Sequence, residues 1–174
     1  MTDYTAVAYR PVVPPGEELV FAMVKPDGTA RDLSDQILKR LAKTGLALRL
    51  AKYVRPMPDQ ARAHFSRKNG SSGTTEDQVI SYLTSGYVHG MVWQGKDAVR
   101  KVRALVGDQT DPFSNRPGTV RYDFAADSIP AANVEGRACH NVMHSSNNGE
   151  SALYEITAWF TPAEFAHLLE PAEP

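Results

Sequence analysis

The stretch Leu19-Val-Phe-Ala-Met-Val-Lys-Pro-Asp-Gly28 decides the fold, because a continuous apolar run ends abruptly in a polar cluster. A short apolar run bounded by turn-forming residues is typical of a buried strand. We therefore predict a buried strand over 19–24 with Lys25-Pro-Asp-Gly28 at its end. Polar clusters at strand ends and in loops are common positions for functional residues.

Downstream, the sequence alternates between helical and strand patterns. Over 32–43, Leu33, Ile37 and Leu41 fall on one helical face, and Gly45 is placed to end that helix. Further strands are predicted at 46–54, 87–93 and 139–143, and further helices at 58–67, 76–84, 96–106 and 150–160. The segment 69–73 is predicted to be a loop, and 107–136 a long segment of low regularity. This order suits an α+β sandwich, a sheet with helices on one face.

Composition limits the class of protein. The chain has 174 residues, of which 42% are hydrophobic, and this size suits a single domain. We expect a Pro-rich arm over 1–18 and one domain over 19–174. The formal net charge of -1 provides no positive field for nucleic acid or acidic lipid, so neither partner is expected. Cys139 alone excludes an intramolecular disulfide, and no signal peptide or membrane span is visible, so a cytoplasmic location is expected.

Three polar clusters carry candidate chemistry: Lys25 to Gly28, Arg103 to Arg121, and Asn141 to His144. His144 precedes a helix that carries Glu155, and helix N-termini attract phosphate. Glu155 is placed to hold one ring nitrogen of the histidine and so to fix its tautomer. The cations Lys25, Arg103, Arg116 and Arg121 suffice to hold a polyphosphate, and Thr110 adds a hydroxyl.

Simpler interpretations compete with each of these. A single histidine in a polar turn is usually a surface or internally satisfied residue, and His64, His89, His140 and His167 keep that interpretation. His140 and His144 lie four apart, as in some metal pairs, but the segment is predicted to be a strand without further nearby ligands, so no side chain is predicted to ligate a metal. The usual glycine-rich phosphate loops are missing.

Taken in order, the clusters resemble the nucleoside diphosphate kinase family from about residue 19 to residue 160. The resemblance rests on several motifs: Phe21-Ala-Met-Val-Lys-Pro-Asp-Gly28 with Arg31, Ser85-Gly-Tyr-Val-His-Gly-Met-Val-Trp93, Arg103-Ala-Leu-Val-Gly107, Thr110-Asp-Pro112, Arg116-Pro-Gly-Thr-Val-Arg121, and Asn141-Val-Met-His-Ser-Ser146 followed by Glu155. Each motif alone is a weak signal. Their shared order makes the resemblance specific.

The resemblance implies a ferredoxin-like βαββαβ fold with a four-stranded antiparallel sheet covered by helices. It implies a homo-oligomer built from dimers, with a hexamer favoured over a tetramer. It also implies a ping-pong transfer of the γ-phosphate of a nucleoside triphosphate to a nucleoside diphosphate, with Mg²⁺ bridging the nucleotide phosphates. Nucleoside di- and triphosphates are thus the expected partners.

Residue roles are also implied by the resemblance. His144 is the expected phosphorylated nucleophile, and Glu155 with Ser146 is expected to orient it. Phosphate contacts are expected from Lys25, Arg103, Thr110 and Arg121, and a ribose contact from Asn141 together with Lys25. Phe65 is expected near the site and Val79 beside the base.

The sequence departs from the family pattern in four places. Thr75 or a neighbour stands where an aromatic residue usually stacks on the base, and His144-Ser-Ser-Asn147 replaces the usual His-Gly-Ser-Asp. One extra residue separates Gly107 from Thr110. The stretch 125–140 is longer than in the shortest relatives, and we expect an inert loop there, with a cover over the site or a subunit contact as alternatives.

Two other classes of function remain as alternatives. A catalytically weak relative that acts as a binding module would fit the departures at Thr75 and Asn147. A nuclease or DNA-binding function is disfavoured by the near-neutral charge. Retention of His144, Lys25, Arg121 and Glu155 together favours the enzyme, because a binding module needs no nucleophile.

Overall fold

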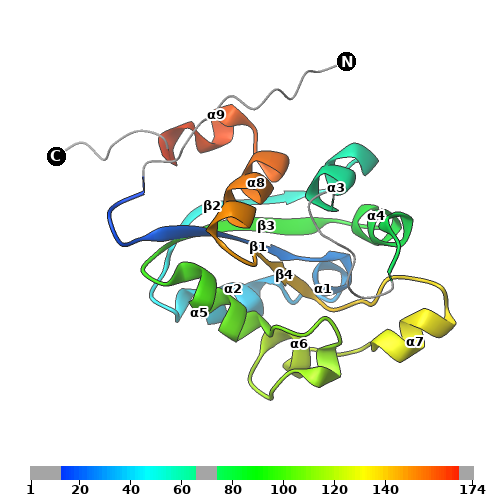
Figure 1. The fold of residues 1–174 in the computed structure, drawn as a ribbon. Coiled ribbons are helices and arrows are strands. Elements are labelled where there is room, and N and C mark those ends of the chain that lie inside the picture. The colour runs from blue at the N-terminus through cyan, green and yellow to red at the C-terminus, as the bar shows by residue number, and fades with distance from the viewer. Residues whose placement is uncertain (1–12, 66–73, 169–174) are drawn as a thin grey trace.

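The computed structural model describes residues 13–65 and 74–168, and Figure 1 shows a central sheet between two groups of helices. Most of the predicted arm over 1–18, the predicted loop over 69–73 and the last residues of the predicted domain lie outside the described residues. Positions 66 and 67 of the predicted helix over 58–67 lie outside them as well.

A four-stranded antiparallel sheet forms the centre of the fold. Its strands are β1 (Glu18–Val24), β2 (Ala47–Val54), β3 (Val88–Gly95) and β4 (Met143–Ser145), in the spatial order β2-β3-β1-β4. β1 pairs with β3 along its whole length and with the short β4 near its C-terminal end, where Met23 lies opposite His144. The predicted buried strand over 19–24 is confirmed, and it lies directly beside the candidate nucleophile.

Helices cover both faces of this sheet (Figure 1). One face carries α2 (Ser34–Ala42), α5 (Ala98–Val106) and α6 (Val120–Asp123). The other face carries α3 (Pro58–Phe65), α4 (Glu76–Thr84), α8 (Gly149–Trp159) and α9 (Pro162–Phe165). The expectation of helices on one face was wrong. Successive residues of β1 point to opposite faces and nearly all are apolar, so each face needs its own cover.

The ferredoxin-like order is nevertheless present. β1, α2, β2, β3, α5 and β4 follow one another as a βαββαβ unit, and both of its helices lie on the same face. The second face is closed by additions to that unit: α3 and α4 lie between β2 and β3, and α8 follows β4. α8 therefore packs on the face toward which His144 points.

Short helices occur where the sequence predicted none. α1 (Pro26–Ala30) begins inside the polar cluster after β1, while η1 (Pro112–Ser114), α6 and α7 (Ile129–Val134) lie in the segment expected to be irregular. η2 (Ala166–Leu168) ends the described chain. Helices this short have no long apolar stripe, so periodicity does not reveal them. Within the described residues, the remaining predicted elements are present with ends shifted by no more than two residues.

The last strand is displaced from its predicted position. The sequence predicted 139–143, whereas β4 is Met143–Ser145. Val142 has a φ of 64°, a left-handed conformation that a β-branched residue rarely adopts, and it interrupts the extended chain. His144 therefore lies within the strand rather than after it.

Candidate active site

His144 is held by a carboxylate from the helix that covers it. His144 is 7% exposed, and its Nε2 lies 2.9 Å from Oε1 of Glu155 on α8. The hydroxyl of Ser146 donates to Oε2 of the same carboxylate over 2.6 Å and accepts the backbone N–H of Phe21. Glu155 is 3% exposed, and both of its oxygens accept a hydrogen bond. The carboxylate is thereby fixed in place, and so is the imidazole.

This geometry decides which ring nitrogen of His144 carries the proton. A carboxylate oxygen only accepts hydrogen bonds, so the nitrogen facing Glu155 is the N–H donor. In the neutral ring the lone pair is then on Nδ1, which makes Nδ1 the nucleophilic atom. A ring that forms a bond through Nδ1 becomes positively charged, and a buried carboxylate on the opposite nitrogen stabilises that charge.

His64, which the sequence did not single out, packs against His144. It is buried on α3, and the two imidazole rings meet edge to face with centroids 4.6 Å apart. Nε1 of Trp159 donates to Nδ1 of His64 over 3.0 Å. The interpretation of His64 as a satisfied residue is confirmed, but its position beside His144 was missed. The available signal was the helical spacing of Ala61 and His64, which share the buried face of α3.

A metal ion would compete with existing hydrogen bonds at this cluster. His64, His144 and Glu155 bring their potential ligand atoms within 4.8 Å of one another. The indole N–H of Trp159 and the hydroxyl of Ser146 already engage two of these side chains. The contacts form a hydrogen-bonded support that fixes the imidazole of His144.

A chain of hydrogen bonds joins Lys25, Asn141 and Thr110, which come from separate segments. Nζ of Lys25 donates to Oδ1 of Asn141 over 2.7 Å, and Nδ2 of Asn141 donates to the carbonyl of Thr110 over 2.9 Å. Asn141 is buried, whereas Thr110 is exposed. The amide of Asn141 is thus held at both ends, and the charge of Lys25 lies beside it.

The backbone between Asn141 and His144 is held by Lys25 and by two residues to which the sequence analysis gave no role, Asp27 and Tyr82. Asp27 accepts the N–H of Val142 over 3.1 Å through Oδ2 and the hydroxyl of Tyr82 through Oδ1. The N–H of Lys25 donates to the carbonyl of Val142 over 2.8 Å. Burial and the neighbouring Asp27 raise the pKa of Tyr82, which keeps its hydroxyl a donor. The left-handed backbone of Val142 is a strained conformation, which costs about 1–3 kcal/mol and persists only where surrounding contacts hold it.

Arg121 is a cation enclosed by backbone carbonyls. Its Nε and Nη2 donate to the carbonyl of Met143 over 3.1 and 3.0 Å, and its Nη1 donates to the carbonyls of Gly107 and Gln109. Burial, together with the nearby charge of Arg103, lowers the pKa of Arg121 to about 10. The guanidinium therefore remains charged at neutral pH, and it is bound to the carbonyl of Met143, the residue that precedes His144.

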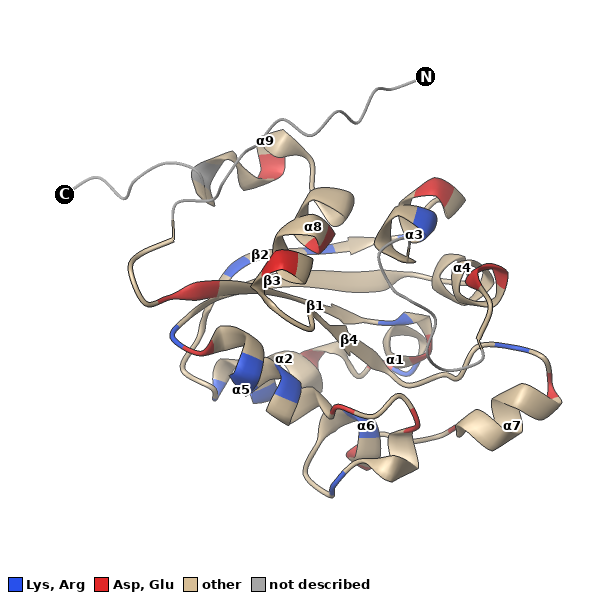
Figure 2. Ribbon diagram, in the orientation of Figure 1, with Lys and Arg blue, Asp and Glu red and all other residues tan. Residues whose placement is uncertain are grey.

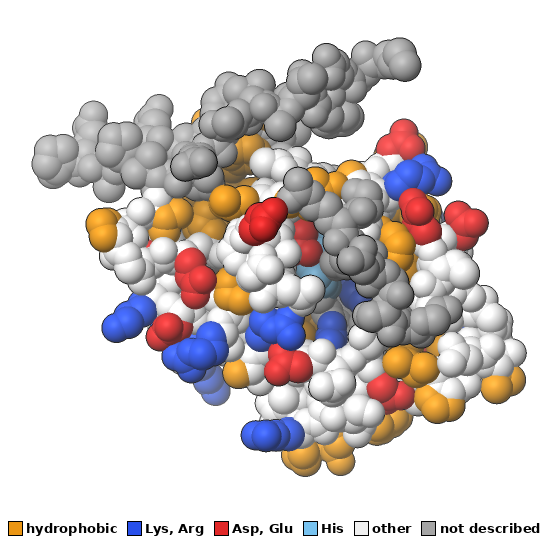
Figure 3. Space-filling view, viewed as in Figure 1, with side chains coloured by type: hydrophobic (Ala, Val, Ile, Leu, Met, Phe, Trp, Pro, Cys, Tyr) orange, Lys and Arg blue, Asp and Glu red, His pale blue; other side chains and the backbone are white. Residues whose placement is uncertain are grey.

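Arg103 lies closer to solvent and contacts two of the departures from the family pattern. It donates to Oδ1 of Asn147 and forms an ion pair with Asp108, with Nη2 and Oδ1 2.7 Å apart. The amide oxygen of Asn147 thus accepts a hydrogen bond from Arg103. The lengthened turn after Gly107 places the carboxylate of Asp108 on the same guanidinium. Figure 2 marks the basic residues along α5, on the face of the sheet opposite α8. On the surface shown in Figure 3, a histidine side chain lies between acidic and basic groups.

Phe65, expected near the site, and Val79, expected beside the base, lie outside the hydrogen bonds described above. Phe65 is the half-buried last residue of α3, and Val79 packs, half-buried, against the core formed with α3 and α8. Thr75, at the expected stacking position, caps α4 instead. Its hydroxyl accepts the N–H of Gln78, and the side chain of Gln78 accepts the N–H of Thr75 in return. The departure at Thr75 therefore stabilises a helix start.

Phosphoryl transfer needs positioning and charge neutralisation more than any other help. The structure supplies both. A carboxylate fixes the imidazole of His144, while Arg121 donates to the carbonyl of the preceding Met143 and Arg103 donates to the nearby Asn147. Fold and site together define an enzyme of the phosphoryl-transfer class.

Comparisons with known proteins identify the family. The family model described as nucleoside diphosphate kinase matches residues 18–165. The nucleoside diphosphate kinase of Staphylococcus epidermidis is 36% identical over 156 residues, which are 90% of this chain and 96% of the relative. Nucleoside diphosphate kinase 1 of Spinacia oleracea is 40% identical over 146 residues, which are 82% of this chain and 88% of the relative. A solved nucleoside-diphosphate kinase from Borrelia burgdorferi matches with a TM-score of 0.77 and 29% identity, covering 86% of this chain and 90% of that one. The chain belongs to the nucleoside diphosphate kinase family.

The activity follows from that membership. The chain is a phosphotransferase that moves the terminal phosphate of a nucleoside triphosphate to a nucleoside diphosphate, the ping-pong reaction of the family. Its substrates are nucleotides, and the family reaction uses a divalent cation. Over residues 13–65 and 74–168, every helix is too short or too polar to cross a membrane.

Proposed function

We propose that Nδ1 of His144 carries the phosphate in both half-reactions. In the first, the Nδ1 lone pair attacks the γ-phosphorus of a nucleoside triphosphate. An N–P bond forms, and the bond to the β–γ bridging oxygen breaks with its electron pair leaving on the diphosphate. In the second, a terminal oxygen of another nucleoside diphosphate attacks the same phosphorus and the N–P bond breaks. The observation that carries this proposal is the 2.9 Å contact between Nε2 and Glu155, because it directs the Nδ1 lone pair toward substrate.

Supporting roles are proposed from the contacts around His144. Glu155 and Ser146 orient the ring and stabilise its charge when the phosphate is attached. Arg121, Arg103, Lys25 and Thr110 bind phosphate oxygens. Asn141, fixed between Lys25 and Thr110, binds the ribose together with Lys25. Phe65 and Val79 border the base, on α3 and α4.

Mg²⁺ is the proposed divalent cation, entering as part of the substrate on the nucleotide phosphates. It neutralises phosphate charge, and it prefers carboxylate and phosphate oxygens. The exposed carboxylate of Asp108 and the amide oxygen of Asn147, both in contact with Arg103, are oxygens of the kind it accepts. The Borrelia burgdorferi relative is described as a transition state mimic with bound vanadate and ADP, which supports a nucleotide-binding and phosphoryl-binding role for the corresponding fold here.

The family membership also supports a homo-oligomer in the cytoplasm, with a hexamer favoured over a tetramer. Six chains of 19.1 kDa would have a mass of about 115 kDa and four chains about 76 kDa. Light scattering on a size-exclusion column separates these masses. Cell fractionation tests the location.

The phosphate-carrier role is tested by incubating the purified protein with γ-labelled ATP and Mg²⁺. We expect label on the protein that is acid-labile, base-stable and transferable to GDP. It should be absent in His144→Ala and present in His89→Gln, a control that changes another buried histidine of the same sheet. Label that persists in His144→Ala would assign the phosphate to another residue. A wild-type protein that binds ATP and never takes up label would support a binding module instead.

A further inference from the structure

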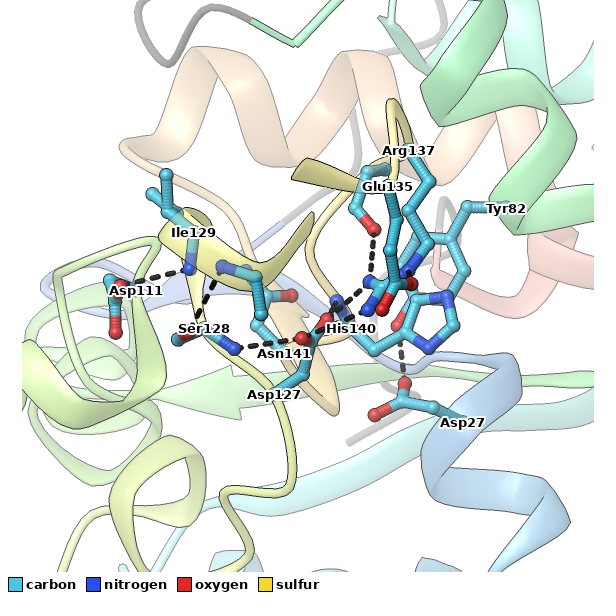
Figure 4. Close-up of polar contacts among 12 residues, drawn as sticks. Asp27, Tyr82, Asp111, Asp127, Ser128, Ile129, Glu135, Arg137, His140 and Asn141 are labelled. Atoms are coloured by element: carbon cyan, nitrogen blue, oxygen red, sulfur yellow. Dashed lines mark hydrogen bonds and ion pairs between the residues drawn. The ribbon is translucent and has the colours of Figure 1, made fainter. Parts of the chain in front are cut away.

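The segment 125–140, which leads from α6 to Asn141, is held mainly by polar contacts (Figure 4). Its helix α7 buries little apolar surface, since Ala132 is buried whereas Val134 is 89% exposed. A loop held only by apolar burial would be weakly fixed here. The position of the segment therefore depends on its polar contacts.

Asp127 is the centre of these contacts. Its Oδ2 accepts the N–H of His140 over 2.8 Å, and its Oδ1 accepts the N–H of Ser128 over 2.8 Å. The guanidinium of Arg137 donates to both oxygens. The side chain of Asp127 is only 7% exposed. Burial alone would raise the pKa of this carboxyl, but the bonds from Arg137 and the two backbone N–H groups outweigh it and lower the pKa to about 2. Asp127 thus stays charged and joins the start of the segment to its end at His140, next to Asn141.

Three further contacts fasten the segment to elements around the site. Oδ2 of Asp111 accepts the N–H of Ile129 over 2.9 Å, and Nε2 of Gln78 on α4 donates to the carbonyl of Gly136 over 2.8 Å. The ring of His140 stacks on Tyr82 with centroids 4.5 Å apart. Tyr82 in turn donates to Asp27 (Figure 4). The segment is therefore joined to the residues that hold Lys25 and Val142.

Asn141 lies between two carboxylates that each bind the backbone of its neighbour. Asp127 binds the N–H of His140 on one side, and Asp27 binds the N–H of Val142 on the other. The direction of the Asn141 amide depends on both, because a side chain follows the backbone from which it projects. Asp27 belongs to the motif after β1, whereas Asp127 is supplied by the longer stretch 125–140.

We propose that the segment 125–140 is a brace that positions Asn141 for the ribose hydroxyls, and that Asp127 is its central positioning residue. The proposal rests on the ribose role of Asn141 proposed above. Asp127 touches no substrate in this scheme. It acts by holding His140 and thereby Asn141.

The test compares ADP with 2′,3′-dideoxy-ADP as phosphate acceptors, because only the first has ribose hydroxyls. We expect the wild-type protein to prefer ADP by about tenfold or more in kcat/KM, as one lost charge-assisted hydrogen bond implies. Asp127→Asn keeps the size of the side chain but replaces an acceptor oxygen with a donor, so some of its partners lose their acceptor. It should reduce kcat/KM for ADP and leave the dideoxy acceptor nearly unchanged. Asn141→Ala should erase the same preference, and the double variant should lose no more than Asn141→Ala does.

Glu164→Gln is the matched control. Glu164 on α9 also binds a cation and a backbone N–H, those of Lys52 and Thr161, and hydrogen bonds likewise outweigh burial to lower its pKa. It should leave the preference for ADP intact. An equal loss with both acceptors in Asp127→Asn, or no loss at all, would overturn the brace.

Amide hydrogen exchange separates failure of the brace from failure of the ribose role. Asp127→Asn should accelerate exchange at residues 140–142, and Glu164→Gln should not. If the wild-type protein shows no preference for ADP, the ribose role of Asn141 is wrong, and exchange alone decides whether Asp127 fixes this backbone. Unchanged exchange at 140–142 rejects the brace whatever the kinetics show.

Discussion

Replacing Glu155 with glutamine should slow phosphate uptake about tenfold. The glutamine oxygen can still accept Nε2–H of His144, and its amide can face the hydroxyl oxygen of Ser146, so the geometry survives and only the charge is lost. Hydrogen bonds to charged groups contribute about 1.5–3 kcal/mol and neutral ones about 0.5–1.5 kcal/mol. The difference, roughly 1.4 kcal/mol, is one factor of ten in rate. Glu155→Ala leaves two buried donors without an acceptor, at about 1–3 kcal/mol each, and should slow uptake at least about a hundredfold.

The assay is a rapid-quench measurement of label transfer from γ-labelled ATP to the protein in a single turnover, which isolates the first half-reaction. The affinity for ATP should change little, because Glu155 contacts the histidine rather than the nucleotide. Glu150→Gln, an exposed carboxylate on the same helix, is the control and should keep the wild-type rate. If Glu155→Gln keeps that rate too, or Glu155→Ala is no slower than Glu155→Gln, the carboxylate does not stabilise the phosphorylated ring.

Other expected outcomes follow from single contacts. In Gly28→Ala, the added Cβ would lie 2.7 Å from Cγ1 of Val24 and 3.1 Å from the carbonyl of Val142, so we expect a loss of about 1–3 kcal/mol in unfolding free energy, measured by denaturant titration. A variant as stable as wild type would show that the segment around Gly28 moves away from Val24 and Val142 at little cost. Arg121→Lys cannot reach the carbonyls of Met143 and Gly107 at once, and kcat/KM should fall about 10- to 100-fold; full activity would mean that a point charge suffices. The pKa of Asp127 is lowered to about 2, so its contribution to stability is complete above about pH 4 and is lost as the pH falls toward 2. Melting temperatures of wild type and Asp127→Asn should converge over that range, and a constant difference would contradict the shift.

Strong local patterns made most of the fold predictable. The continuous apolar run over 19–24 identified β1, and the helical spacing of apolar residues over 32–43 identified α2, because buried elements leave such patterns in the sequence. The number of covered faces was not predictable from the same trace. Phe21 and Met23 show that the second face of β1 is apolar, but which helices cover that face depends on how the chain returns after β2 and β4.

Site residues that belong to sequence motifs were predictable, whereas those brought to the site by tertiary packing were not. His144, Glu155 and Ser146 meet as the resemblance implied. His64 on α3 and Tyr82 on α4 reach the site through tertiary contacts. A histidine or a tyrosine in a helical segment does not by itself indicate a functional role. Asp127 lies in a stretch without periodicity, where a carboxylate that organises a turn looks the same as one that faces solvent.

The conformation of Val142 decides how the side chains of Asn141 and His144 lie relative to each other. In a continuous strand, residues 141 and 144 would point to opposite faces of the sheet, since side chains alternate. The left-handed conformation of Val142 breaks that alternation, so Asn141 meets Lys25 while His144 keeps its register opposite Met23. Glycine would adopt this conformation without strain, but it would give up a fully buried side chain that contributes about 1.5–3 kcal/mol. That burial and the bonds from Asp27 and Lys25 offset the strain. β4 therefore begins at Met143 instead of continuing from residue 139, and this break allows Asn141 and His144 their separate contacts.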